Sequence, residues 1–201
     1  LVRDRYGIKP LYYAQFGNAF LFSSEQKSIM EHPKFKKEVA YEALFEYFTF
    51  QNLFTNKTLF KNVNLLEPAS IACINGQKGL QIKKYWDYQF EDPDEKYSQS
   101  EYEEELNRLI KQAVNRQLVT DVELGSYLSG GMDSGTLTAL SAKQIPDMKT
   151  FTCGFDLSSA SGMELLFDER QKAEAMSAVF KTEHYEMVLK AGDMERCMKK
   201  L

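Results

Sequence analysis

The 201-residue chain has few cysteines, and they are not grouped in a way that would hold a metal or build a disulfide framework. Its three cysteines, Cys73, Cys153 and Cys197, lie far apart and form no CxxC pair. An odd number of scattered cysteines is typical of proteins in a reducing compartment. We therefore expect a cytoplasmic protein without disulfides.

Long apolar segments and a surplus of positive charge are also missing. No run approaches the roughly 20 apolar residues that a bilayer-spanning helix needs, so no membrane association is expected. The formal net charge is -4 and no basic stripe occurs, which argues against a nucleic-acid partner. With 43% hydrophobic and 27% charged residues, the composition is that of a globular protein with one large domain or two small ones.

The first part of the chain predicts short antiparallel strands and short helices. Two hairpins are predicted, at 11–22 around Gly17-Asn18 and at 69–85. Helices are predicted at 23–33 and at 39–50. The second helix is expected to present one apolar side, formed by Leu44, Phe45, Tyr47 and Phe48.

Residues 91–97 form the predicted linker, because they are acidic, contain Pro93 and lack aliphatic side chains. The predicted domains are therefore 1–92 and 93–201. Neither the first residues nor the last ones resemble a natural chain end, so we expect an internal part of a longer protein.

The second part alternates helices and strands. An amphipathic helix is predicted at 98–120, with a capping box formed by Ser100 and Glu103. Its apolar face is expected to consist of Tyr102, Leu106, Leu109, Ile110, Ala113 and Val114. The elements predicted after it are strands at 124–128, 149–155 and 184–189 and helices at 134–145, 167–181 and after 192. Such alternation predicts a parallel sheet with right-handed crossovers and a ligand at the carboxyl ends of its strands.

The segment Ser129-Gly130-Gly131-Met132-Asp133-Ser134 lies at such a strand end. Its two glycines let the backbone N–H groups approach an anion closely, and the following helix adds its positive end. The serines could donate to phosphate oxygens, while Asp133 beside a phosphate implies a bridging cation such as Mg2+. A plain glycine turn is the alternative, but it leaves the Asp and the two Ser unexplained. The Lys-Ser/Thr ending of a Walker A loop is missing.

The loop and its surroundings resemble a known family. Residues 128–134 match the SGGxDS signature of the PP-loop ATPases, which cleave ATP between its α and β phosphates and adenylate a carboxylate. Asp121-Val122, Tyr127 and residues 150–155 narrow the resemblance to the asparagine synthetases. The resemblance implies Mg2+ on Asp133 and nucleotide contacts at Leu128, Ser129, Gly130, Gly131, Asp133, Ser134, Cys153 and Gly154. One departure is Gly135, where the family usually has Ser.

Residues 1–13 resemble the RDxxGxxPLYY pattern of class II glutamine amidotransferases. The resemblance implies that Asp4 binds the amino group of glutamine. A surface ion pair of Asp4 with Arg3 or Arg5 is the alternative. The family's nucleophilic N-terminal Cys and its later SGxGxDE segment are expected outside this chain, so no catalytic residue is assigned within it.

The fold expected from the resemblance is α+β and α/β. It combines the C-terminal part of an Ntn-type class II glutaminase domain with the start of a PP-loop parallel-sheet synthetase domain. The activity expected for the intact protein is ATP-dependent synthesis of asparagine from aspartate and glutamine-derived ammonia. A β-lactam synthetase-like or other related amide former, and a non-catalytic remnant or binding module, stay open. The expected partners are the small molecules glutamine, aspartate and ATP, and a homodimer of the intact enzyme is left open.

Overall fold

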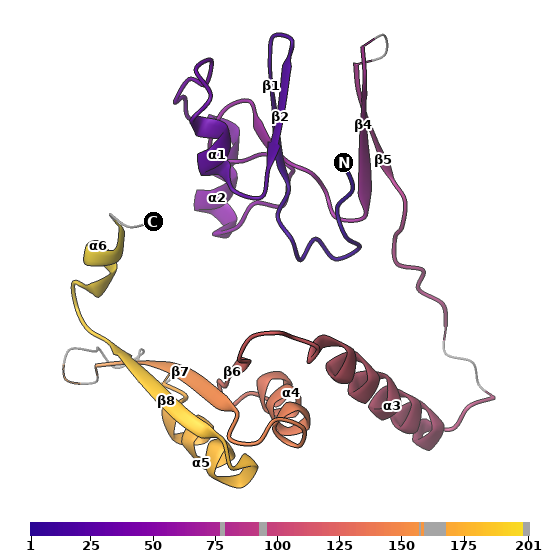
Figure 1. Ribbon diagram of the computed structural model, residues 1–201, viewed down its shortest axis with the longest axis vertical. Coiled ribbons are helices and arrows are strands. Elements are labelled where there is room, and N and C mark those ends of the chain that lie inside the picture. The colour runs from indigo at the N-terminus through magenta and orange to yellow at the C-terminus, as the bar shows by residue number, and fades with distance from the viewer. Residues whose placement is uncertain (77–78, 93–95, 157, 159–167, 199–201) are drawn as a thin grey trace. The chain divides into compact units, whose positions relative to one another are not determined.

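The chain forms two compact units, Leu1–Asp92 and Pro93–Leu201, in a computed structural model that describes residues 1–76, 79–92, 96–156, 158 and 168–198 (Figure 1). Part of the predicted linker, residues 93–95, lies outside the described residues. None of the described helices is both long enough and apolar enough to cross a membrane.

The first unit contains two small antiparallel sheets and two short helices (Figure 1). One sheet has the strand order β2-β1-β3 and the other pairs β4 with β5. Both predicted hairpins are confirmed by this pairing. The elements of the unit are β1 Tyr12–Phe16, β2 Ala19–Ser23, α1 Gln26–Met30, α2 Tyr41–Phe50, β3 Val63–Leu65, β4 Ser70–Asn75 and β5 Gly79–Lys84.

The core of the first unit consists of two small clusters. Tyr13, Leu66 and Ala72 form one cluster, and Ala14, Ile29 and Val63 form the other. Tyr13 and Ala14 are neighbours on β1, so the two faces of this strand serve different clusters.

Helix α2 packs differently from what its apolar pattern suggests. Ala43 is its buried residue, whereas Phe45 and Phe48 are 71% and 74% exposed. The apolar side formed by Leu44, Phe45, Tyr47 and Phe48 is therefore largely exposed in this unit. An apolar stripe shows which side of a helix can be buried, but it does not show what covers it.

The second unit is built on a three-stranded parallel sheet in the order β6-β7-β8 (Figure 1). The prediction of parallel strands is confirmed, and β7 has the bounds that the sequence indicates. The elements of this unit are α3 Gln99–Gln117, β6 Gly125–Tyr127, α4 Met132–Ala142, β7 Lys149–Phe155, α5 Arg170–Phe180, β8 Glu183–Leu189 and α6 Asp193–Met198.

Helices α4 and α5 contact the sheet and each other. Strand β7 shows the resulting asymmetry, because Thr150, Thr152 and Gly154 are buried while the residues between them are exposed. Alternate residues of a strand point to opposite faces. One face of β7 is therefore covered, and the other carries exposed Phe151 and Cys153.

Helix α3 begins with a capping box formed by Ser98 and Glu101. The Ser98 N–H donates to Glu101 Oε2 at 2.7 Å, and the Glu101 N–H donates to Ser98 Oγ at 3.4 Å. The predicted box at Ser100 and Glu103 is wrong. A Glu follows three residues after each serine, so spacing alone does not identify the cap.

The predicted apolar face of α3 is also largely exposed. Leu106 and Leu109 are 57% and 45% exposed, and Val114 is the helix residue that is buried. The first part of α3 therefore has no core beneath it among the described residues of its own unit. An amphipathic pattern predicts that a face can be buried, not which element covers it.

Candidate functional site

The start of the glycine loop is fixed by the neighbouring strand. The Leu128 N–H donates to the Phe151 carbonyl oxygen at 2.9 Å, and the Leu128 side chain is 1% exposed. The Thr152 hydroxyl donates to the Leu128 carbonyl. Backbone and side chain of Leu128 are therefore held at the carboxyl end of β6, where a ligand of a parallel sheet binds.

Two serines hold the loop in shape. Ser129 Oγ and Ser134 Oγ lie 3.0 Å apart, and the Ser129 N–H donates to Ser134 Oγ at 3.2 Å. The Ser134 hydroxyl also contacts the Gly131 carbonyl oxygen at 3.2 Å. The two hydroxyls thus close the loop on itself and lie together at its centre.

The loop leads into the first turn of α4. Gly131 is the N-cap residue and no side chain caps the helix. The first N–H groups of a helix have no acceptor within the helix, and they lie at its positive end. With Asp133 in the same turn and exposed, this turn offers N–H donors to an anion and a carboxylate to a cation that accompanies it.

Gly130 is required by both its backbone and its surroundings. Its φ is 72°, in the region that side chains disfavour. A Cβ at this position would lie 2.6 Å from Lys172 Cβ and 3.5 Å from the Glu169 carbonyl oxygen. The loop therefore packs directly against the first turn of α5.

Gly135, which replaces the family's usual Ser, is buried in α4 beside α5. A Cβ there would lie 3.1 Å from Met176 Sδ. The missing hydroxyl is thus accompanied by a close approach of the two helices, with the Met176 side chain against the glycine.

Gly154 lies under the side chain of Arg170, which is not among the predicted site residues. A Cβ at Gly154 would overlap Arg170 Nε and lie 2.9 Å from Arg170 Cγ. Arg170 also donates from Nη2 to the Phe155 carbonyl oxygen at 3.2 Å. Cys153, its neighbour on β7, is exposed and points to the other face of the strand.

Arg170 is fixed by an ion pair with Asp168. Arg170 Nη2 lies 2.5 Å from Asp168 Oδ2, and the two side chains are 21% and 10% exposed. The hydrogen bonds from Arg170 hold the pKa of the Asp168 carboxyl below its ordinary value. The pair holds the guanidinium at the carboxyl end of β7, with its charge balanced by the Asp168 carboxylate.

The first turn of α5 joins the parts of the site. Its residues contact Gly130 on one side and Gly154 on the other. The structure therefore brings together Leu128, Ser129, Gly130, Gly131, Asp133, Ser134 and Gly154, but leaves Cys153 on the opposite face. A glycine inside a strand often marks a close approach of another group, so Gly154 could have indicated such a contact, although not its partner Arg170.

A second candidate region surrounds Asp4. Its Oδ1 accepts hydrogen bonds from the N–H groups of Tyr6 and Ile8, and its Oδ2 accepts one from Lys9 at 3.1 Å. These backbone hydrogen bonds lower the pKa of the Asp4 carboxyl, with Lys9 as the largest contribution. The exposed carboxylate organises the loop 4–9 and keeps a lone pair on Oδ2 for a further donor.

The buried Arg3 side chain also holds the loop 4–9 in place, through hydrogen bonds to backbone carbonyl groups. It is 8% exposed and donates to the carbonyl oxygens of Lys9 at 3.1 Å and Gly7 at 2.8 Å, and also to Leu66. Arg5 instead lies over the Trp86 ring, 5.6 Å from its centroid. Within the described part of the chain neither arginine forms an ion pair with Asp4, so the alternative of a surface ion pair is wrong.

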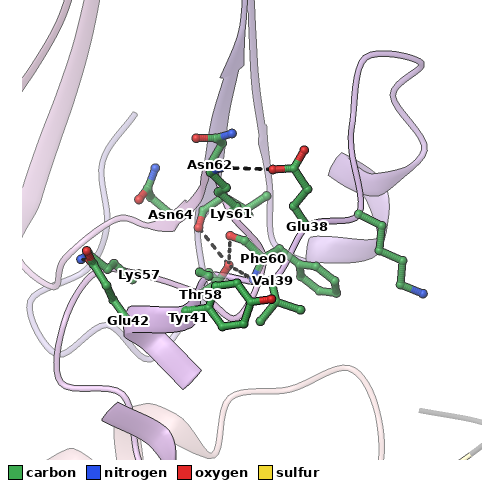
Figure 2. A pocket seen from close by; sticks show the side chains of 13 residues that line it. Glu38, Val39, Tyr41, Glu42, Lys57, Thr58, Phe60, Lys61, Asn62 and Asn64 are labelled. Atoms are coloured by element: carbon green, nitrogen blue, oxygen red, sulfur yellow. Dashed lines mark hydrogen bonds and ion pairs between the residues drawn. The ribbon is translucent and has the colours of Figure 1, made fainter. Parts of the chain in front are cut away.

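A separate pocket of about 740 Å³ lies beside the start of α2 (Figure 2). Its lining includes Val39, Tyr41 and Phe60, and two ion pairs flank it, Lys61 with Glu38 at 3.2 Å and Lys57 with Glu42. None of the predicted site residues lines this pocket.

A preformed metal site was not found among the described residues, since no three His, Cys, Asp or Glu side chains gather at one point there. The three cysteines are exposed free thiols in this structure.

The fold and the loop together define a class of protein, an α/β protein with a glycine-rich strand–loop–helix unit. Comparison with known families narrows this class. The glutamine amidotransferase domain model matches residues 1–86, and the asparagine synthase model matches residues 105–201. The chain belongs to the family of glutamine-hydrolysing asparagine synthetases.

Individual relatives agree with this assignment. Asparagine synthetase [glutamine-hydrolyzing] 3 of Bacillus subtilis is 31% identical over 96% of this chain and 32% of its own length. A putative asparagine synthetase of Methanocaldococcus jannaschii is 30% identical over 98% of this chain and 38% of its own length. The amidase chyE of Penicillium rubens is 28% identical over 79% of the chain and 25% of its own length. The chain thus spans about a third of the length of these curated relatives.

Proposed function

We propose that the chain is part of an ATP-dependent amide ligase that makes asparagine from aspartate with ammonia released from glutamine. The observation that carries the proposal is the closed glycine loop between β6 and α4, with uncapped helix N–H groups beside it. In this proposal residues 1–92 belong to an Ntn-type glutaminase domain and residues 93–201 to a PP-loop synthetase domain. The family assignment and the named relatives support it. We also expect the protein to act in the cytoplasm.

The proposed roles in the nucleotide site follow from the geometry of the loop. The N–H groups of the first turn of α4 would bind the phosphates that leave as pyrophosphate. Leu128, Ser129, Gly130, Gly131 and Ser134 would shape that binding site, and Gly154 would lie towards the rest of the nucleotide. Cys153 would contribute only its backbone, because its side chain points to the opposite face of β7. The aspartate carboxylate would then be adenylated and the adenylate attacked by ammonia, with release of AMP.

Asp133 is the proposed ligand for Mg2+. Its exposed carboxylate in the first turn of α4 fits an ion that shares its other oxygen ligands with phosphates and water. When bound, Mg2+ would neutralise charge on the phosphates. Asp133 would orient the nucleotide through that ion.

The proposed role of Asp4 is to bind the amino group of glutamine. Its carboxylate is held in place by three backbone N–H groups and is exposed. A rigid, ionised carboxylate favours an ammonium partner.

A related amide-forming reaction is the second candidate. The Penicillium relative named amidase chyE shows only that a similar sequence carries a different activity name. The non-catalytic binding module is a third candidate, distinguished from both ligases by the lack of turnover in the full-length protein.

Calorimetric titration of the 201-residue chain with pyrophosphate and with ATP, each with Mg2+, tests the proposal. We expect both ligands to bind and EDTA to weaken both. Asp133→Asn should weaken binding about tenfold or more, since it removes a charged metal ligand. Asp147→Asn is the matched control, an exposed aspartate before β7 whose change should leave binding intact.

Two results would contradict the proposed nucleotide site. One is that neither ATP nor pyrophosphate binds in the presence of Mg2+. The other is that Asp133→Asn binds both ligands as well as Asp147→Asn does.

A further inference from the structure

Arg170 is the most firmly held cation beside the proposed site. Its Nε contacts both carboxylate oxygens of Asp168, at 2.9 and 3.0 Å, and its Nη2 contacts Asp168 Oδ2 at 2.5 Å. A further bond from Nη2 reaches the Phe155 carbonyl oxygen at 3.2 Å. The guanidinium is thereby fixed in one orientation against the backbone of β7.

The position of Arg170 follows from a missing side chain. Gly154 leaves its Cα bare, and the Arg170 side chain occupies the space that a Cβ would need. The contact lies near the carboxyl end of β7, one strand away from the glycine loop. Ligands of open parallel sheets bind along this edge. A nucleotide whose phosphates lie in the loop can therefore extend along the edge to β7.

The Nη1 group of the Arg170 guanidinium is available to bind a ligand. Arg170 Nη1 makes no hydrogen bond with any residue that the structure describes. Arginine offers five N–H donors and a planar face that stacks on aromatic rings. A fixed guanidinium with free donors is therefore suited to bind a flat or anionic group without much further loss of side-chain entropy.

We propose that Arg170 is a nucleotide-binding residue that contacts the nucleoside monophosphate part of ATP at the carboxyl end of β7. Asp168 acts as the residue that positions it, and Gly154 provides the space in which it lies. The inference rests on the proposed nucleotide site and adds to it the side on which the nucleoside lies. Pyrophosphate, which lacks that part, is bound by the loop alone.

The test compares ATP with pyrophosphate on the same 201-residue chain, with Mg2+ present. Arg170→Ala is expected to raise the Kd for ATP about tenfold or more, the size typical of hydrogen bonds from a charged group. The Kd for pyrophosphate should stay within about twofold, which also shows that the unit is folded. Arg170→Lys should lose most of the same affinity, because an ammonium lacks the planar fork.

Two further variants separate a binding role from a structural one. Gly154→Ala should displace the Arg170 side chain and weaken ATP binding, and the double variant with Arg170→Ala should bind ATP no worse than either single variant. Arg108→Ala is the matched control, because Arg108 forms a similar short-range ion pair with Glu105 on α3. Its change should leave both Kd values unaltered.

The outcomes distinguish the inference from the function on which it rests. If the unmodified chain binds neither ligand, the proposed nucleotide site fails and this inference with it. If the chain binds both ligands and Arg170→Ala binds ATP normally, only the role of Arg170 is overturned. Equal loss of ATP and pyrophosphate binding in Arg170→Ala would also overturn it, since the arginine would then be structural.

Discussion

At the scale of single residues, the site depends on contacts that glycines allow. Gly130 and Gly154 each leave space that a residue of α5 fills, Lys172 in one case and Arg170 in the other. The sequence predicts the glycine loop from its local pattern, but it contains no local signal for which side chain lies against each glycine. Such contacts join residues 130 and 172, which are 42 positions apart in the chain, and residues 154 and 170, which are 16 positions apart.

Gly130→Ala should destabilise the second unit through strain and overlap together. The positive φ alone costs roughly 1–2 kcal/mol for a residue with a Cβ, and overpacking against Lys172 adds about 1–3 kcal/mol. Gly192→Ala is the control, because Gly192 has a φ of 84° with nothing near its missing Cβ. Denaturant unfolding of both variants should therefore show the larger loss for Gly130→Ala, and equal losses would contradict the contact with Lys172.

Asp4→Asn should weaken the first unit in a pH-dependent manner. The folded-state pKa of Asp4 is lowered by backbone hydrogen bonds, so its contribution is present above the unfolded pKa of about 3.9 and is lost as the pH falls through the folded value. At pH 7 the urea midpoint of Asp4→Asn should lie below that of the unmodified chain, and the difference should shrink under acidic conditions.

Asp92→Asn provides the comparison for Asp4→Asn. Asp92 is exposed at the end of the first unit, and its change should move the midpoint little at either pH. A pH-independent difference for Asp4→Asn would mean that its effect does not come from the ionised carboxylate.

At the scale of helices and strands, the sequence predicts where most elements lie but not which faces they bury. The bounds of β7 and both hairpins follow from local patterns, because alternation and turn residues are local signals. The faces of α2 and α3 do not follow, because burial depends on what packs against a helix. Phe48 and Leu106 are exposed although they lie in apolar stripes.

The start of α3 offers a direct test of the observed cap. Ser98→Ala should cost about 1 kcal/mol, because it removes the acceptor for the Glu101 N–H. Ser100→Ala should cost nothing or slightly stabilise the helix, since alanine is the better helix former. Thermal unfolding followed by circular dichroism measures the stability of both variants. A larger loss for Ser100→Ala than for Ser98→Ala would favour a cap at Ser100 instead.

At the scale of the whole molecule, the chain contains two compact units, and both core clusters of the first unit consist of that unit's own residues. Units that are compact by themselves can unfold in separate transitions. Calorimetric unfolding should show two transitions. Pyrophosphate with Mg2+ should raise only the midpoint temperature of the second unit, by mass action on its folded state. Asp4→Asn should lower only the midpoint temperature of the first unit. One shared transition that responds to both changes would show that the two units unfold together.

The contact of Arg170 with Gly154 also restricts how residues 154 and 170 can vary among related sequences. Any change that gives residue 154 a side chain removes the space in which the arginine lies, so the two positions cannot vary independently. Among aligned relatives, a residue with a Cβ at 154 is expected to occur together with a short side chain at 170, and an arginine at 170 together with glycine at 154. Frequent pairing of arginine at 170 with a larger residue at 154 would contradict this coupling.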